Sequence, residues 1–318
     1  QGQLVAVEYS IDLTPARPNG NEPETLTGTS EDDLIDGFGG DDSIEGLAGD
    51  DILIGGDGND TIDGGSGINR LYGDAGDDVV NAAGFDTVDL GEGNNGLSVG
   101  ETSTGGSYVA GMGNDEFTIS GGSSGARTIS AGGGTNSLRV STGATGSVSF
   151  VSASGDDRVV IDSGTTDQIW INAGDGNNSM EADANLQSWT SGSGNDVVDL
   201  RGRVKLVSTG SGDDGITSSS QIGSSGSVYQ YYSRWISYDT QGNRLSEYEV
   251  SSYIYDGIFA GAGDDSVVLS GGVGSPGFYS YSYYGTDSYY WSYESGYYNE
   301  YEYAYGSSEF TVTSRETY

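Results

Sequence analysis

Aspartates recur at a fixed nine-residue spacing near the start of the sequence, and such spacing can place carboxylates in a row. Residues 28–81 divide into six consecutive nine-residue units without an insertion. The sixth position of these units is occupied by Asp33, Asp42, Asp51, Asp60, Asn69 and Asp78. Carboxylate and carbonyl oxygens are hard ligands that suit calcium better than transition metals. The spacing therefore predicts an array of oxygen-liganded calcium sites.

Two other positions of the unit indicate how these aspartates are held. The eighth position is always a branched aliphatic residue, and the fourth is mostly glycine, with Gly40, Gly49, Gly58 and Gly76 as candidate carbonyl ligands. Glycine allows the positive φ of a tight turn, and one inward aliphatic side chain fits a short strand. We expect the first six residues of each unit to form a turn and the last three to form a strand. Two units would complete one coil, about 4.8 Å from the next coil.

This nonapeptide resembles the glycine-rich repeat of the RTX (repeats-in-toxin, haemolysin-type) calcium-binding proteins. The resemblance is close over residues 27–90 and looser over residues 91–270. It implies an all-β, right-handed parallel β-roll, or β-solenoid, with Ca²⁺ bound in stacked turns. It also implies a secreted protein, extracellular or at the cell surface of a bacterium. Such proteins leave the cell unfolded by type I secretion, guided by a C-terminal signal, and fold on meeting calcium.

The turn signature continues after the strict period ends at residue 81. A glycine followed by Asp or Asn residues now recurs at intervals of about two nonapeptides, so the turn appears once per coil. The corresponding candidate ligands are Asp115, Asp157, Asp196, Asp214 and, in a last turn at residues 261–269, Asp265. Where Asn95, Asn136 and Asn178 replace Asp, we expect weaker or empty sites. We predict one solenoid over residues 27–222, with calcium ladders on both edges over residues 27–90 and on one edge over residues 91–222.

The two ends of the chain differ from the repeats. Residues 1–26 contain an alternating strand at residues 3–13 and a proline-rich linker. That strand is expected either to cap the sheet of its own chain or to pair with a neighbouring molecule. Residues 223–318 hold 20 of the 23 tyrosines. Their alternation predicts a Tyr-rich antiparallel β region with a hairpin inserted in the solenoid.

Composition excludes several classes of function. The chain has 48 acidic and 11 basic residues, a net charge of -37, and neither cysteine nor histidine. Disulfides, zinc-thiolate sites and histidine-dependent catalysis are therefore absent, and nucleic acid is a poor partner for this charge. No apolar run reaches the roughly 20 residues of a membrane span, so we expect no membrane insertion. About ten bound Ca²⁺ ions would offset more than half of this charge.

These features favour a non-enzymatic structural protein. We expect it to assemble with other copies of itself into a surface layer or extracellular filament, as in a biofilm matrix. An alternative is an adhesin or carbohydrate-binding module that holds a surface glycan on its tyrosines. A further alternative is a solenoid polysaccharide lyase, for which Arg201, Arg203 and Lys205 are the candidate bases.

Overall fold

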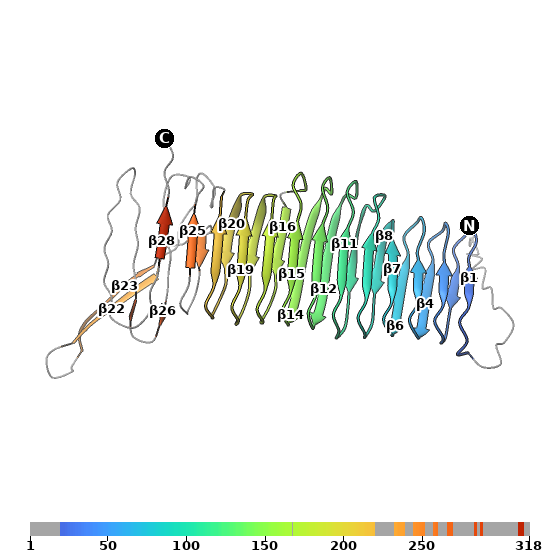
Figure 1. Ribbon diagram of the computed structural model, residues 1–318, viewed down its shortest axis with the longest axis horizontal. Coiled ribbons are helices and arrows are strands. Elements are labelled where there is room, and N and C mark those ends of the chain that lie inside the picture. Colours follow the sequence, from blue (N-terminus) through green and yellow to red (C-terminus); the bar gives the residue numbers. More distant parts are fainter. Residues whose placement is uncertain are drawn as a thin grey trace, which may run out of the picture.

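The computed structural model describes residues 20–166 and 168–219, and beyond them the backbone of the strands within residues 232–314. In this part of the chain every regular element is a β-strand, and the strands stack into an elongated solenoid (Figure 1). No helix in these residues is long and apolar enough to cross a membrane. The predicted all-β parallel solenoid is confirmed.

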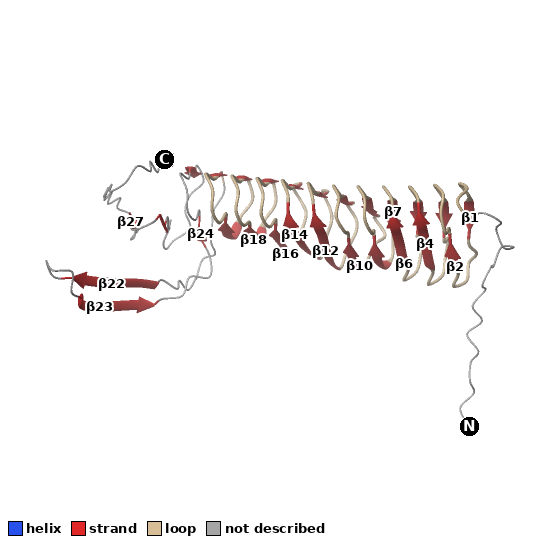
Figure 2. Ribbon diagram, turned by 90° about the horizontal axis from the view of Figure 1, so that it is seen from below, coloured by secondary structure: helices blue, strands red, loops and turns tan. Residues whose placement is uncertain are grey.

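Two long parallel sheets form opposite sides of the solenoid, and loops join them at both edges (Figure 2). The first sheet contains thirteen strands: β1 (Thr25–Thr27), β3 (Ser43–Glu45), β5 (Thr61–Asp63), β7 (Val79–Ala82), β9 (Gly96–Val99), β11 (Glu116–Ile119), β13 (Ser137–Val140), β15 (Arg158–Ile161), β17 (Ser179–Ala182), β19 (Val197–Leu200), β21 (Gly215–Ser218), β25 (Ser266–Leu269) and β28 (Thr311–Ser314).

The second sheet contains eleven strands and alternates with the first along the chain. Its strands are β2 (Leu34–Asp36), β4 (Ile52–Asp57), β6 (Arg70–Ala75), β8 (Phe85–Asp89), β10 (Gly105–Val109), β12 (Ala126–Gly133), β14 (Ser147–Ser154), β16 (Gln168–Asn172), β18 (Leu186–Thr190), β20 (Val204–Ser208) and β24 (Gly257–Phe259). Each coil therefore contributes one strand to each sheet, as the pairing of two nonapeptides predicts.

The strand register follows the repeat length. Ile44 pairs with Ile62, which pairs in turn with Val80, so equivalent positions lie two nonapeptides apart. In the looser part Phe117 pairs with Leu138, a slightly longer step along the chain. The inward side chains thus form a continuous column in each sheet. Those of the first sheet, from β3 to β21, are Ile44, Ile62, Val80, Leu97, Phe117, Leu138, Val159, Met180, Val198 and Ile216, all 0–3% exposed.

One predicted strand face differs from the structure. The sequence alternation places Val204 and Leu206 on the inner face of β20, but Leu206 is half-buried and Val207 is fully buried. Val207 pairs with Trp189, which occupies the same inward column in β18. β18 has the same shift, because its buried residues Leu186 and Trp189 are three positions apart and pair with Val204 and Val207.

The C-terminal part is described only as strands. β22 (Tyr232–Tyr238) and β23 (Arg244–Ser251) form an antiparallel hairpin between β21 and β24 in the sequence. β26 (Tyr283–Tyr284) pairs with β27 (Asp287–Ser288), and β28 pairs parallel with β25. The expected N-terminal strand at residues 3–13, the turn before β25 and the tyrosine side chains lie outside the described residues. The domain boundaries at residues 26, 90 and 222 remain a prediction.

The buried aliphatic columns should supply much of the stability. We expect Ile62→Ala to lower the free energy of unfolding by about 2–5 kcal/mol, because it leaves a cavity between Ile44 and Val80. Val79→Ala, on the exposed face of the neighbouring strand, should change it by about 0.5 kcal/mol or less. Urea unfolding in excess calcium measures both. Equal losses would contradict the assignment of this column as the core.

Candidate metal sites

The sixth-position side chains all point into the solenoid at the turns. In the described coils they are at most 4% exposed: Asp33, Asp42, Asp51, Asp60, Asn69, Asp78, Asn95, Asp115, Asn136, Asp157, Asn178, Asp196 and Asp214. They alternate inward with the aliphatic residue two positions later, because successive side chains of an extended chain face opposite sides. The structure therefore places every predicted Asp ligand in a buried row, apart from Asp265, which lies outside the described residues.

A hydrogen-bond ladder joins these side chains from coil to coil. At the edge that precedes the first sheet, the backbone N–H of Asp60 donates to Oδ1 of Asp78, which lies one coil away. Ten such bonds of 2.7–3.0 Å run without a break from Glu24 to Asp214. Because an Asn and an Asp both offer Oδ1, either residue continues this ladder.

The ladder at the other edge is short. It runs from Asp33 through Asp51 and Asn69 to Asp86. There Oδ2 of Asp86 accepts the N–H groups of Ala83 and Gly84 in its own loop, at 2.9 and 3.2 Å. The sequence analysis missed Asp86, which falls outside the nine-residue register. This hydrogen-bond ladder therefore ends at Asp86, and the change from calcium ladders on two edges to one edge stays a prediction.

Exposed side chains at the fifth position accept a second series of hydrogen bonds, which runs between coils in the opposite direction along the chain. The N–H of Asp50 donates to Oδ1 of Asp32 in the preceding coil, and that of Asp77 donates to Asn59. The buried ladder reaches forward along the chain, whereas this exposed one reaches back. Each turn is therefore held to the coils on both sides of it.

The second carboxylate oxygen of several buried aspartates has no hydrogen-bond partner among the described residues. These aspartates include Asp51, Asp60, Asp78 and Asp115. An ionised carboxylate that is buried without a partner carries a large free-energy cost. The arrangement therefore calls for a cation or a proton at Oδ2.

The glycine at the first position of the unit leaves space beside this oxygen. A Cβ built on Gly46 would lie 2.5 Å from Oδ2 of Asp51 and 2.9 Å from the carbonyl oxygen of Gly64, one coil away. Calcium binds oxygens at about 2.3–2.6 Å, so an ion a few tenths of an ångström from this point would contact both oxygens. We call such a point an oxygen cradle. Gly37, Gly55 and Gly73 adjoin cradles of the same kind. Beside Gly28 the carboxylate oxygen, Oδ2 of Asp33, also accepts hydrogen bonds from the N–H and the hydroxyl group of Thr29.

Asparagine closes the cradle with its own amide. Nδ2 of Asn69 donates to the carbonyl oxygen of Gly64 at 2.9 Å, and Nδ2 of Asn178 donates to that of Gly176 at 3.0 Å. The amide hydrogens thus satisfy carbonyl oxygens that would otherwise face a cation. This geometry explains why an empty site is expected at these positions.

The fourth-position glycines have a clear steric role. Gly40, Gly49, Gly58 and Gly76 have φ between 109° and 146°, where side chains are disfavoured. A Cβ on Gly58 would collide with the carbonyl oxygen of Gly40 in the preceding coil. The role of their carbonyls as ligands remains a prediction. The cradles instead show the importance of the first-position glycines, which the sequence analysis did not single out although all six units share them.

Each cradle has one buried carboxylate rather than a carboxylate cluster. The residues that the structure describes contain no group of three or more His, Cys, Asp or Glu side chains placed to hold a metal. Most ligands would therefore be backbone carbonyls, whose positions depend on the stacking of the coils. Metal binding and coil stacking should stabilise each other.

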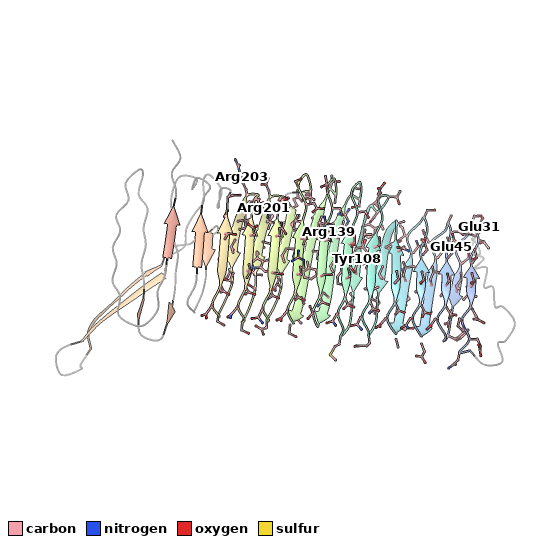
Figure 3. All side chains as sticks on the ribbon, in the orientation of Figure 1. Glu31, Glu45, Tyr108, Arg139, Arg201 and Arg203 are labelled. Carbon is pink, nitrogen blue, oxygen red and sulfur yellow. The ribbon has the colours of Figure 1, made fainter. Side chains whose placement is uncertain are left out.

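Two of the candidate lyase residues, Arg201 and Lys205, contact neighbouring side chains on the sheet surface. Arg201 contacts three exposed carboxylates, those of Glu181, Asp183 and Asp199, at 2.8–2.9 Å (Figure 3). A guanidinium held by carboxylates stays protonated and cannot accept a proton. Lys205 donates to the side-chain oxygen of Gln187. These contacts fit outward side chains on a sheet surface.

Burial raises the pKa of the ladder aspartates. The pKa of Asp78 and that of Asp115 rise from the usual 3.8 to about 6. Burial also raises the pKa of Asp51, Asp60 and Asp157. The cause is removal from water, which disfavours the charged form of a carboxyl group.

Asp60→Asn should remove one bound calcium ion. The new amide would donate to a turn carbonyl as Asn69 does, so the calcium-free protein should become more stable while the gain on adding calcium becomes smaller. Equilibrium dialysis and thermal unfolding with and without calcium measure these effects. Glu45→Gln removes an exposed carboxylate on the outer face of β3 (Figure 3), and this makes it the matched control. An unchanged ion count in Asp60→Asn would contradict the site.

The calcium-free protein should become more stable as the pH falls from about 7 to about 4. The folded pKa of Asp115 exceeds its unfolded value, so the folded state binds more protons across this window. The gain is roughly 1–3 kcal/mol for this carboxyl group. Urea unfolding in chelator across this pH range measures it. Asp115→Asn should flatten the dependence, and an unchanged slope in this variant would contradict the assignment.

Comparison with known families matches the part of the chain that contains the oxygen cradles. A family model of the RTX calcium-binding nonapeptide repeat, four copies, matches residues 19–53 and 54–86. A search of curated proteins finds no match to the chain. Nonapeptide repeats of this type bind calcium ions, and the oxygen cradles beside Asp51 and Asp60 fit that ion. Residues 19–86 of this chain therefore belong to the family of RTX calcium-binding nonapeptide repeats.

Proposed function

We propose that this chain is a secreted, non-enzymatic structural protein that assembles outside the cell into a surface layer or filament in the presence of calcium. The observation that carries the proposal is the extent of the solenoid. Its coils occupy residues 25–218 without an intervening domain of another type. Calcium-binding repeats in such a solenoid form a structural element rather than an accessory to a separate catalytic domain.

The N-terminal end of the solenoid offers a surface for assembly. β1 and β2 are the first strands of the two sheets, and each pairs on one side only within the described residues. Leu26 and Ile35 stand first in the inward columns and are only partly buried. An edge strand exposes N–H and C=O groups that can pair with another chain. The alternating residues 3–13 have the pattern of a strand that could be exchanged between copies.

The charge of the chain supports folding outside the cell. A net charge of -37 disfavours a compact state until cations bind. Proteins with RTX repeats are generally secreted, and calcium is far more abundant outside cells than inside. Binding that requires the folded turns makes calcium a switch for folding.

Electron microscopy of the purified protein in millimolar calcium should show ordered polymers that dissolve on addition of a chelator. Deletion of residues 1–19 should abolish them if the N-terminal strand is donated to a neighbour. Leu26→Lys should shorten them, because it places a charge on the open end of the inward column. Ile68→Lys, at an exposed turn position, should leave them unchanged.

Two results would contradict this proposal. Monodisperse monomers in calcium would argue against assembly, and glycan binding by such monomers would favour an adhesin. Polymers that persist in both the deletion variant and Leu26→Lys would show that the N-terminal end is not the contact surface.

A further inference from the structure

The residue at the first position of the turn changes type along the solenoid. In the nonapeptides it is always glycine, and the carboxylate or amide follows five residues later. From the next coils onward, the position five residues before each ladder side chain carries a Cβ. Along the edge with the long ladder these residues are Leu90, Ala110, Ala131, Ser152, Ala173, Ser191 and Thr209.

The backbone at this position is the same in both parts of the solenoid. The N–H of Gly46 donates to the carbonyl of the strand end one coil on, Asp63, at 2.8 Å. The N–H of Ala110 makes the equivalent bond to Ser130 at 2.8 Å, and that of Ala173 bonds Thr190 at 2.9 Å. Gly46 and Ala110 lie at opposite edges of the solenoid, but each follows a strand and makes the same hydrogen bond to the next coil. We therefore expect the Cβ of Ala110 on the same side of its turn as the Cβ built on Gly46.

The middle of the turn is also preserved. Two residues after the first position, Ala48 forms a parallel bridge with Ser66, and Met112 forms the same bridge with Gly133. The ladder bond that follows is likewise present in both parts, at Asp51 and at Asp115. The difference between the two kinds of turn is thus the added side chain and not a different course of the backbone.

The added side chain occupies the point that suits a calcium ion. A Cβ at the position of Gly46 lies within 2.9 Å of both cradle oxygens. An alkyl carbon there leaves no room for a cation that needs oxygens at about 2.3–2.6 Å. Ala110, Ala131 and Ala173 are at most 5% exposed, so their methyl groups are enclosed in the turn.

Serine at this position makes the polar contacts itself. Oγ of Ser191 donates to the carbonyl oxygen of Thr209 at 3.4 Å, the equivalent of the Gly64 oxygen in a cradle. Oγ of Ser152 donates to the Gly132 carbonyl at 3.3 Å and accepts a hydrogen bond from Nδ2 of Asn136 at 3.2 Å. A hydroxyl group thus occupies this space in the serine turns.

We infer that calcium binding is confined to the N-terminal part of the solenoid. The five turns with glycine at the first position and Asp at the sixth bind calcium: Gly28–Asp33, Gly37–Asp42, Gly46–Asp51, Gly55–Asp60 and Gly73–Asp78. The turns from Leu90 to Asp214 fold without it, and Asp115, Asp157, Asp196 and Asp214 are ladder residues rather than ligands. The inference rests on calcium binding by the repeats and not on secretion or assembly.

The consequence is a solenoid with two modes of stabilisation. Its N-terminal coils, which include the open sheet edges at β1 and β2, order only when calcium is present. The coils from β11 onward are held by their buried columns and by the ladder alone. Because each coil contacts only its neighbours, the two parts can respond separately to calcium.

Substitutions that open or close a cradle test this inference in the full chain. Ala110→Gly should restore a cradle beside Asp115 and add one bound calcium ion. Ala131→Gly opens the same space beside Asn136, which has no carboxylate, and should add none. Asp157→Asn should leave the ion count unchanged, whereas Asp60→Asn lowers it by one. Equilibrium dialysis, which counts bound ions per chain whether or not copies assemble, measures all four variants.

Hydrogen exchange with and without chelator provides an independent readout. Chelation should increase amide exchange in β3 to β7 by about tenfold or more, because local opening there loses its stabilising ligand. Exchange in β11 to β21 should change by less than about twofold.

Several results would overturn the inference. They are a loss of one ion in Asp157→Asn, an unchanged ion count in Ala110→Gly, or a uniform rise in exchange along the solenoid. Wild-type protein that binds no calcium would contradict calcium binding by the repeats altogether. Failure to polymerise would affect the proposed assembly alone, because bound ions and exchange rates are measured per chain.

Discussion

The bond from a turn N–H to the Oδ1 of Asp or Asn in the next coil is the interaction on which the solenoid depends. Turn amides have no place in the two sheets, and a buried N–H without an acceptor destabilises the folded state. The sixth-position side chain supplies that acceptor in every described coil from β1 to β21. It therefore sets the spacing of the turns, while the aliphatic residue two positions later fills the interior between the sheets.

The other atom of the same side chain decides the chemistry of each turn. In Asn69 and Asn178 it is an amide nitrogen that donates to a turn carbonyl. In Asp51 and Asp60 it is an oxygen that faces a carbonyl of the next coil across the space left by a glycine. The raised pKa of Asp78 and Asp115 shows that burial disfavours the bare charge. A cation, a proton or an amide can each relieve that cost, and the first-position residue determines whether a cation has room.

This arrangement joins structure to the proposed role. Stacked coils exchange contacts only with their neighbours, so calcium acts on the coils that bind it and on those beside them. The coils with open cradles lie at the end where both sheets present an edge strand. Calcium would then order the surface through which copies meet, whereas the longer part of the solenoid keeps its shape by apolar packing. Arg201 and its three carboxylates, on the outer face, show that single charges there are used for contacts between coils.

Much of the fold follows from the sequence because the repeat is local and regular. The nine-residue period alone determined the turn, the strand, the pairing of Ile44 with Ile62 and the burial of Asp51, since identical units can stack only in register. The recurrence of the turn signature at about two nonapeptides also predicted the later coils. Only the tertiary structure determined the features that interrupt or modify the repeat. Asp86 ends one ladder by accepting hydrogen bonds from its own loop, and the inward alternation shifts by one residue in both β18 and β20. The space beside each carboxylate depends on a Cβ and a carbonyl from different coils. Glycine at position 46 and alanine at position 110 differ by one methyl group. Only the stacking of the coils indicates that this methyl group lies where a calcium ion would bind.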